Sequence, residues 1–216
     1  EANAYVEATT YIAILLGLIL GTLLPTGMAI AILIAFAVVG YFASCQIPNA
    51  PAPRPNAEIS RNIFKATKSI LILIHKHPVI FTSILGTTWF WTIGALVAVQ
   101  MYPLSVTLNV TSGVITFFLI IFSVGVAAGS ISCGKLLKGI IHATYVPISV
   151  LGMGIGLYML FFLTRNYSAP KETATFLEFM ARKSAWGISF SLFWLAFFGG
   201  TYIVPLNALM QSHAPK

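Results

Sequence analysis

The sequence predicts an all-α membrane protein, a polytopic bundle of transmembrane helices. Of its 216 residues, 58% are hydrophobic and only 8% are charged, whereas a soluble domain carries about 25% charged residues. A helix needs roughly 20 apolar residues to cross the hydrocarbon core of a bilayer, and the chain offers such stretches repeatedly. None shows the alternation of apolar and polar residues that is typical of a membrane β-barrel strand.

Six spans are predicted, in the order in which the apolar stretches follow one another. They cover residues 5–24, 28–45, 79–102, 113–133, 145–164 and 185–210. The short connections after the first and third spans contain Pro25 and Pro103 and no basic residue. The long connection between the second and third spans divides the chain into two spans before it and four after it.

The basic residues predict the orientation, because cytoplasmic connections collect lysine and arginine. Eight of them fall on one side, in the second and fourth connections and the tail: Arg54, Arg61, Lys65, Lys68, Lys76, Lys135, Lys138 and Lys216. Four fall on the other side, in the fifth connection: Arg165, Lys171, Arg182 and Lys183. The larger number of basic residues on the first side predicts that both ends of the chain face the cytoplasm. We also interpret the chain as a fragment of a longer membrane protein.

The long second connection has two parts with different properties. Residues 46–56 contain four prolines, which cannot continue a helix and indicate a stiff linker. Residues 58–74 place isoleucine and alanine at helical spacing, with Arg61, Lys65 and Lys68 opposite them. This pattern predicts an amphipathic helix lying on the cytoplasmic surface of the membrane.

The composition argues against an enzyme and against a nucleic-acid partner. All five acidic residues are glutamates, so carboxylate pairs and magnesium sites that need aspartate are excluded. The net charge of +7 lies in the connections, where anionic membrane lipids are the natural partner. The two cysteines, Cys45 and Cys133, lack metal-ligand spacing and are predicted to be packing residues. No cofactor or metal site is predicted.

Some side chains within the spans are candidates for a transport pathway. Glu7 lies near the start of the first span, where an ionisable group is either functional or simply interfacial. Trp89 and Trp91 lie about ten residues into the third span, deeper than the usual aromatic belt. They are predicted to line a cavity or to pack against neighbouring helices.

Two further sets of residues are open to both a structural and a functional interpretation. The neutral polar residues Gln100, Asn207 and Gln211 are either hydrogen-bonding links between helices or substrate contacts. Pairs of glycines four residues apart, which let helix backbones approach closely, are Gly17 and Gly21, Gly125 and Gly129, and Gly152 and Gly156. Such glycine faces serve either fixed packing between helices or the sliding of one helix along another.

Four strings in order resemble the lysophospholipid transporter family of the major facilitator superfamily. They are AYVEA running into AILLGLILG at residues 4–21, TWFWTIGA at 88–95, FSVGVAAGS at 122–130, and GGTYIVPLNALMQ at 199–211. The resemblance implies a twelve-helix protein of two halves, with the six spans matching helices five to ten. Residues 1–45 would then be the last two helices of the first half. Residues 46–78 would be the cytoplasmic linker, and residues 79–216 the first four helices of the second half.

The resemblance also implies a function in the bacterial inner membrane. Members of this family move lysophospholipids from the outer to the inner leaflet for reacylation. In many bacteria they are fused to, or encoded beside, an acyltransferase and an acyl-acyl-carrier-protein synthetase. The expected mechanism is rocking of the two halves about a midplane cavity, with Glu7, Trp89, Trp91, Gln100, Asn207 and Gln211 as candidate contacts. A multidrug or small-solute exporter of the same superfamily, and a non-transporting anchor for an acyltransferase, remain alternatives.

Overall fold

The structure is a helical bundle in which one central helix packs against three other long helices. The computed structural model describes residues 5, 9–10, 12–14, 16–17, 20–21, 24–47, 62–138, 140 and 142–213. Its helices are α2 (Thr26–Cys45), α3 (Ile63–His75), α4 (Pro78–Leu108), α5 (Ser112–Leu137), α6 (Val146–Arg165), α7 (Phe176–Met180) and α8 (Lys183–Ser212). The described residues contain no strand beyond a single bridge between Val110 and Ala174.

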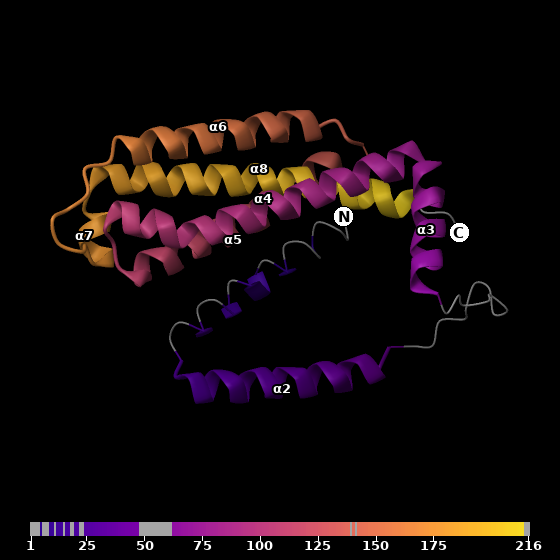
Figure 1. Ribbon diagram of the computed structural model, residues 1–216, viewed down its shortest axis with the longest axis horizontal. Coiled ribbons are helices and arrows are strands. Elements are labelled where there is room, and N and C mark those ends of the chain that lie inside the picture. Colours follow the sequence, from indigo (N-terminus) through magenta and orange to yellow (C-terminus); the bar gives the residue numbers. More distant parts are fainter. Residues whose placement is uncertain are drawn as a thin grey trace.

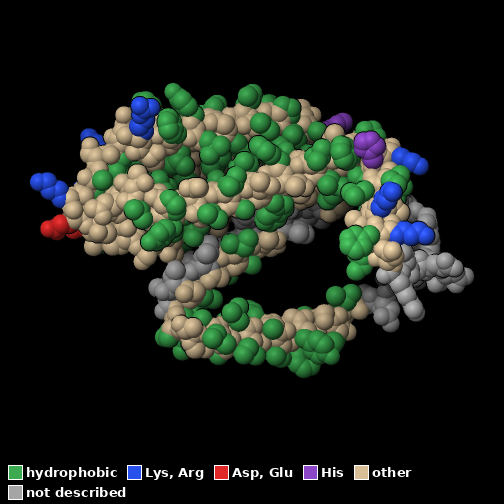
Figure 2. Space-filling view, in the orientation of Figure 1, with side chains coloured by type: hydrophobic (Ala, Val, Ile, Leu, Met, Phe, Trp, Pro, Cys, Tyr) green, Lys and Arg blue, Asp and Glu red, His purple; other side chains and the backbone are tan. Residues whose placement is uncertain are grey.

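The predicted membrane spans are confirmed for the described part of the chain. Five helices there are long and apolar enough to cross a bilayer, namely α2, α4, α5, α6 and α8. The first predicted span, at residues 5–24, lies largely outside the described residues. Figure 2 shows the charged side chains gathered at the two ends of the bundle, with hydrophobic side chains between them. This distribution suits a bilayer, whose polar surfaces flank an apolar core.

The helix α4 is longer than its predicted span because Pro103 does not end it. The apolar stretch was predicted to finish at residue 102, yet α4 continues through Pro103 to Leu108. Asn109 then ends the helix in the left-handed conformation, at φ 50°. A helix of 31 residues is about 46 Å long, which exceeds the roughly 30 Å hydrocarbon core. Part of α4 therefore tilts or projects beyond the core.

The central helix α8 packs against α5, α6 and α4 (Figure 1). Its side chains Ile188, Leu192 and Leu195 are almost completely buried. The helix α5 approaches α8 most closely where glycines replace side chains. A Cβ atom on Gly125 would lie 2.7 Å from the Cβ of Ala196, and one on Gly129 would overlap the backbone of Phe197. These helices therefore meet backbone to backbone.

The helix α6 meets α8 through its own pair of glycines. A Cβ atom on Gly152 would overlap the ring of Phe198, and one on Gly156 would lie 3.0 Å from the Cα of Leu195. By contrast, a Cβ atom on Gly17 or Gly21 would meet nothing within 4 Å. Two of the three glycine pairs thus lie at contacts with α8.

The connections at one end of the bundle are joined by hydrogen bonds. The side-chain amide of Asn109 donates to the carbonyl of Pro170 at 2.8 Å, and the Thr173 hydroxyl donates to the Asn109 side chain at 3.0 Å. The backbones of Asn109 and Thr111 also bond to Ala174. The α4–α5 connection and the segment before α7 therefore form one structured cap over this end.

The amphipathic pattern corresponds to α3, which lies across the opposite end of the bundle (Figure 1). It begins after Asn62, whose side chain accepts a hydrogen bond from the Lys65 N–H at 3.1 Å. The first four residues of the predicted amphipathic helix, 58–61, lie outside the described residues. Ile63, Phe64 and Ile70 are exposed, so the apolar face of α3 is available to lipid.

Candidate functional site

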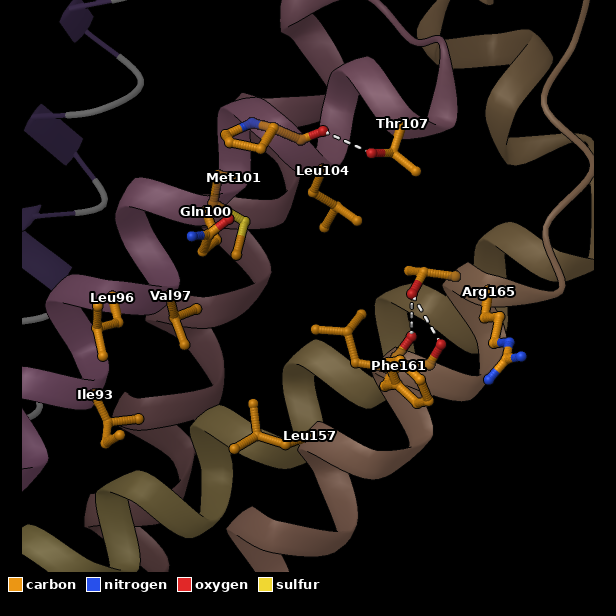
Figure 3. Close-up of a pocket in the computed structure, with 13 residues that line it drawn as sticks. Ile93, Leu96, Val97, Gln100, Met101, Leu104, Thr107, Leu157, Phe161 and Arg165 are labelled. Carbon is orange, nitrogen blue, oxygen red and sulfur yellow. Dashed lines mark hydrogen bonds between the residues drawn. The ribbon is translucent and has the colours of Figure 1, made fainter.

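An apolar groove lies between α4 and α6 and has a volume of about 610 Å³ (Figure 3). Small-molecule sites typically occupy roughly 300–1,000 Å³. Most of the residues that line the groove are aliphatic or aromatic, and they include Ile93, Leu96, Val97, Leu104, Leu157 and Phe161. The groove therefore offers an apolar ligand an environment like that of the bilayer core.

The groove extends over about one leaflet of the membrane. On α4 it runs from Ile93, which lies midway between Pro78 and Leu108, to Thr107 near the end of the helix. At 1.5 Å per residue this stretch is about 21 Å long, compared with about 15 Å for half of the hydrocarbon core. On α6 it ends at Arg165, the last residue of that helix.

Most polar groups of the groove lie at the end formed by Thr107, Thr164 and Arg165. The hydroxyl of Thr107 donates to the Pro103 carbonyl at 3.0 Å, and that of Thr164 to the Leu160 carbonyl at 2.7 Å. These hydroxyls are therefore satisfied within their own helices. The Arg165 guanidinium lies 6.0 Å from the centre of the Phe161 ring, and no carboxylate pairs with it in the described part of the chain. Apart from Gln100, the groove is thus apolar along its length, with a cation at one end.

Of the predicted site residues, Gln100 lines this groove. Trp89 and Trp91 are 58% and 49% exposed and do not line it. Phe90 lies between them, is buried, and stacks on Tyr202 with 6.4 Å between ring centres. Because successive helical residues are about 100° apart, the tryptophans project to nearly opposite sides of α4.

The remaining predicted residues lie elsewhere. Asn207 is half-buried and Gln211 is exposed, and both follow Pro205 on α8. Glu7 lies outside the described residues. The structure thus does not bring the five described candidates together, and it places Gln100 alone of them in the groove.

A second polar feature joins α5, α6 and α8 inside the bundle. The hydroxyls of Ser149 and Thr201 lie 2.8 Å apart, and the Cys133 thiol donates to the Thr201 carbonyl at 3.5 Å. These residues are 1%, 7% and 1% exposed, respectively. We call Cys133, Ser149 and Thr201 the polar node. Cys133 is buried, as a packing residue should be, but it is also a hydrogen-bond donor.

Comparison with curated protein sequences finds relatives of this chain. The lysophospholipid transporter LplT of Klebsiella pneumoniae (strain 342) is 28% identical over 221 residues, which cover 98% of this chain and 50% of the relative. That of Cronobacter sakazakii is 28% identical over 230 residues, and that of Escherichia coli O1:K1 is 27% identical over 227. In both cases the match covers 100% of this chain and 51% of the relative. These transporters are homologues of the chain.

The homologues confirm the resemblance found in the sequence. The chain spans about half the length of the curated relatives it matches. No protein-family model matches it, and no solved structure matches it. Together, five apolar helices and bacterial homologues support a multi-pass protein of the bacterial inner membrane.

Sequence reasoning missed the groove's cation and the polar node. Arg165 was counted only for membrane orientation, although its position four residues after Phe161 puts a cation and an aromatic ring on one helix face. Thr201 precedes Pro205 by four residues, and this spacing indicates a carbonyl without its usual helical donor. Its partners on α5 and α6 are far away in the sequence and carried no such signal.

Proposed function

We propose that the whole protein containing this chain moves lysophospholipids across the bacterial inner membrane by alternating access. The observation that carries the proposal is homology to lysophospholipid transporters over nearly the entire chain. The chain itself acts in transport and not in catalysis. An acyltransferase and an acyl-acyl-carrier-protein synthetase, fused or separate, would be its functional partners.

The chemistry of the groove supports a ligand with one acyl chain and an anionic headgroup. Its apolar walls can surround an acyl chain, in place of lipid, over the depth of one leaflet. At its interfacial end, Arg165 can form charge-assisted hydrogen bonds with a phosphate. A small hydrophilic solute would gain little from such a lining, which makes a lipid substrate the better fit.

The proposed orientation places the outer end of the groove at the outer leaflet. The charge distribution assigns the α4–α5 connection to the side opposite the cytoplasm, and Thr107 and Arg165 lie at that end. In this arrangement residues 46–78 form the cytoplasmic linker between two halves. Residues 1–45 supply the last two helices of the first half, and residues 79–216 supply the first four helices of the second half. A lysophospholipid in the outer leaflet would reach the groove directly.

The contacts proposed for the headgroup and chain are Glu7, Trp89, Trp91, Gln100, Asn207 and Gln211, together with Arg165. Gln100 and Arg165 act in the groove. The others would act at surfaces that the rest of the transporter or the substrate covers. The glycines Gly125, Gly129, Gly152 and Gly156 would keep α5 and α6 close to α8 while the halves rock.

Uptake of labelled lysophosphatidylethanolamine by spheroplasts that express the whole protein tests the proposal. We expect faster conversion to diacyl lipid than in spheroplasts lacking the protein, with the acyltransferase supplied at equal level. Equal rates, with an active acyltransferase in both, would indicate a membrane anchor instead. Export of a hydrophilic drug without lysolipid uptake would identify an exporter.

A further inference from the structure

We propose that the polar node supports α8 where Pro205 removes a backbone hydrogen bond, and that the hydrogen bonds of the node break and re-form as α8 moves during transport. Cys133, Ser149 and Thr201 are positioning residues in this sense and need not touch the substrate. The positioning role stands on the geometry alone. The movement rests on the proposed transport function.

Pro205 leaves one carbonyl of α8 without its helical hydrogen bond, and the polar node lies at this carbonyl. In an α-helix each carbonyl accepts from the N–H four residues later, and proline has no N–H. The carbonyl of Thr201 therefore loses its ordinary donor. The thiol of Cys133 on α5 donates to this carbonyl instead. Since Pro205 and Cys133 are both almost completely buried, water does not supply the missing bond.

The hydroxyl of Thr201 ties the same turn of α8 to α6. It lies 2.8 Å from the Ser149 hydroxyl, while it also reaches the Phe198 carbonyl at 2.9 Å and Ser149 reaches the Tyr145 carbonyl at 2.7 Å. Each hydroxyl has a single hydrogen to donate. Two hydrogens are thus available for three contacts. The bond between the two hydroxyls therefore has two arrangements, one with Ser149 as the donor and one with Thr201 as the donor.

The α5–α8 crossing beside the node is not fully hydrogen-bonded. A Cβ atom on Gly200 would lie 2.7 Å from the backbone nitrogen of Ser130, so Ser130 lies directly against α8. Its hydroxyl is buried and has no partner within the described part of the chain. Buried polar groups in a static core are normally paired. An unpaired hydroxyl at a smooth backbone crossing is instead consistent with a contact that changes partners.

A movement of α8 at Pro205 would shift the residues that follow Pro205 on this helix. A Cβ atom on Gly86 of α4 would lie 2.8 Å from Leu206 and 2.9 Å from the Tyr202 hydroxyl. These two side chains lie on either side of Pro205 in the sequence of α8. A change of direction at Pro205 would therefore alter the contact between α4 and α8 and displace Asn207 and Gln211.

A double-mutant cycle on the whole protein tests the positioning role. Cys133→Ala removes the donor, and Pro205→Ala restores a backbone N–H that can bond to the Thr201 carbonyl. We expect Cys133→Ala to slow lysophospholipid uptake roughly three-fold, the size of one weak hydrogen bond, but to have no effect on the Pro205→Ala background. Cys133→Ser should restore the rate because it keeps a donor. Equal losses on both backgrounds would show that Cys133 only packs.

The infrared S–H stretching band gives a readout that does not depend on transport. In a Cys45→Ala protein without other cysteines, the Cys133 band should lie at the lower frequency of a hydrogen-bonded thiol. Pro205→Ala should shift it to higher frequency, because the Thr201 carbonyl then bonds to the backbone. An unchanged band would overturn the positioning role, even if the protein transports lysophospholipid.

Alkylation by N-ethylmaleimide tests the movement, with the two cysteines compared by mass spectrometry in one sample. Cys45 is exposed and Cys133 is buried. Addition of lysophospholipid should raise the alkylation rate of Cys133 severalfold and leave that of Cys45 unchanged. A Cys133 rate unchanged during measurable uptake would overturn the movement alone. Absence of uptake in the unmodified protein would instead reject the proposed function.

Discussion

The indole N–H of Trp194 on α8 donates a hydrogen bond to the backbone carbonyl of Gly152 on α6, with 3.0 Å between nitrogen and oxygen. The same indole packs against Phe198, with 5.0 Å between ring centres. Phe198 in turn covers the site where a Gly152 side chain would lie. Trp194 therefore links α8 to α6 by a hydrogen bond, and its ring also packs against Phe198, the α8 side chain that meets α6 at Gly152.

Replacement of Trp194 by phenylalanine should remove this bond while keeping an aromatic ring. We expect a loss of about 1 kcal/mol in the free energy of unfolding, since hydrogen bonds between membrane helices are individually modest. Thermal unfolding of the purified protein in detergent measures it. Trp186→Phe is the matched control, because Trp186 bonds to Met180 just outside its own helix. A larger effect of Trp186→Phe would contradict the assignment.

Alanine at Gly129 should be much more damaging than alanine at Gly154. A side chain at Gly129 would overlap the backbone of Phe197, whereas one at Gly154 would meet nothing within 4 Å. Overpacking costs typically about 1–3 kcal/mol, and backbone cannot move aside as a side chain can. We expect Gly129→Ala to lower the unfolding temperature and Gly154→Ala to leave it unchanged or raised. Equal tolerance would show that α5 and α8 are not in close contact.

Arg165→Gln should weaken lysophospholipid transport more than Lys171→Gln. Both changes remove one exposed positive charge from the same connection, but only Arg165 lines the groove. Loss of a charge-assisted bond to phosphate should raise the KM for uptake about ten-fold. Uptake at several lysophospholipid concentrations separates KM from the maximal rate. If both variants behave alike, the groove receives another part of the protein and not the headgroup.

The α6–α8 connection should respond to acid through Glu178. Its carboxylate accepts the Thr175 N–H at 2.8 Å, and the Glu178 N–H donates to the Thr175 hydroxyl at 3.5 Å. Hydrogen bonds from the backbone and then the side chain of Thr175 lower the pKa of Glu178 below its ordinary 4.5. Because the folded pKa is lowered, the bonds stabilise α7 above about pH 4.5 and this stabilisation is lost as the pH falls through the folded value.

Titration of the Glu178 carboxyl carbon by nuclear magnetic resonance measures this pKa. Thr175→Ala should raise it toward 4.5 because the hydroxyl is lost. Glu178→Gln should keep an acceptor at the same position while removing the acid sensitivity of α7. A Glu178 midpoint that is ordinary both with and without Thr175 would contradict the capping arrangement.

Sequence patterns predicted the spans well because each depends on a local property, the length of an apolar run. The boundary of α4 was misplaced because Pro103 was treated as an end, whereas the carbonyl of Pro103 accepts the Thr107 hydroxyl and the helix continues. The glycine pairs were visible, but their partners on α8 were not. Nothing in a single sequence indicates that Gly129 faces Phe197.

The groove could not be predicted, since its walls come from α4 and α6, which are separated by all of α5. Gln100 was a candidate as a polar residue in an apolar run, and it does line the groove. Trp89 and Trp91 were candidates by depth alone. Their two-residue spacing already implies that they diverge on a helix, so the sequence contained the information that they do not share one cavity on α4.

The hydrogen-bonded cap at Asn109 and Ala174 fixes the relative positions of α4, α5, α6 and α8 at one end of the bundle. Helices joined there can separate more readily at their other end. That end contains Pro205 and adjoins α3, which is part of the proposed linker (Figure 1). We therefore expect relative motion of these four helices to be smaller on the side of α7 than on the side of α3.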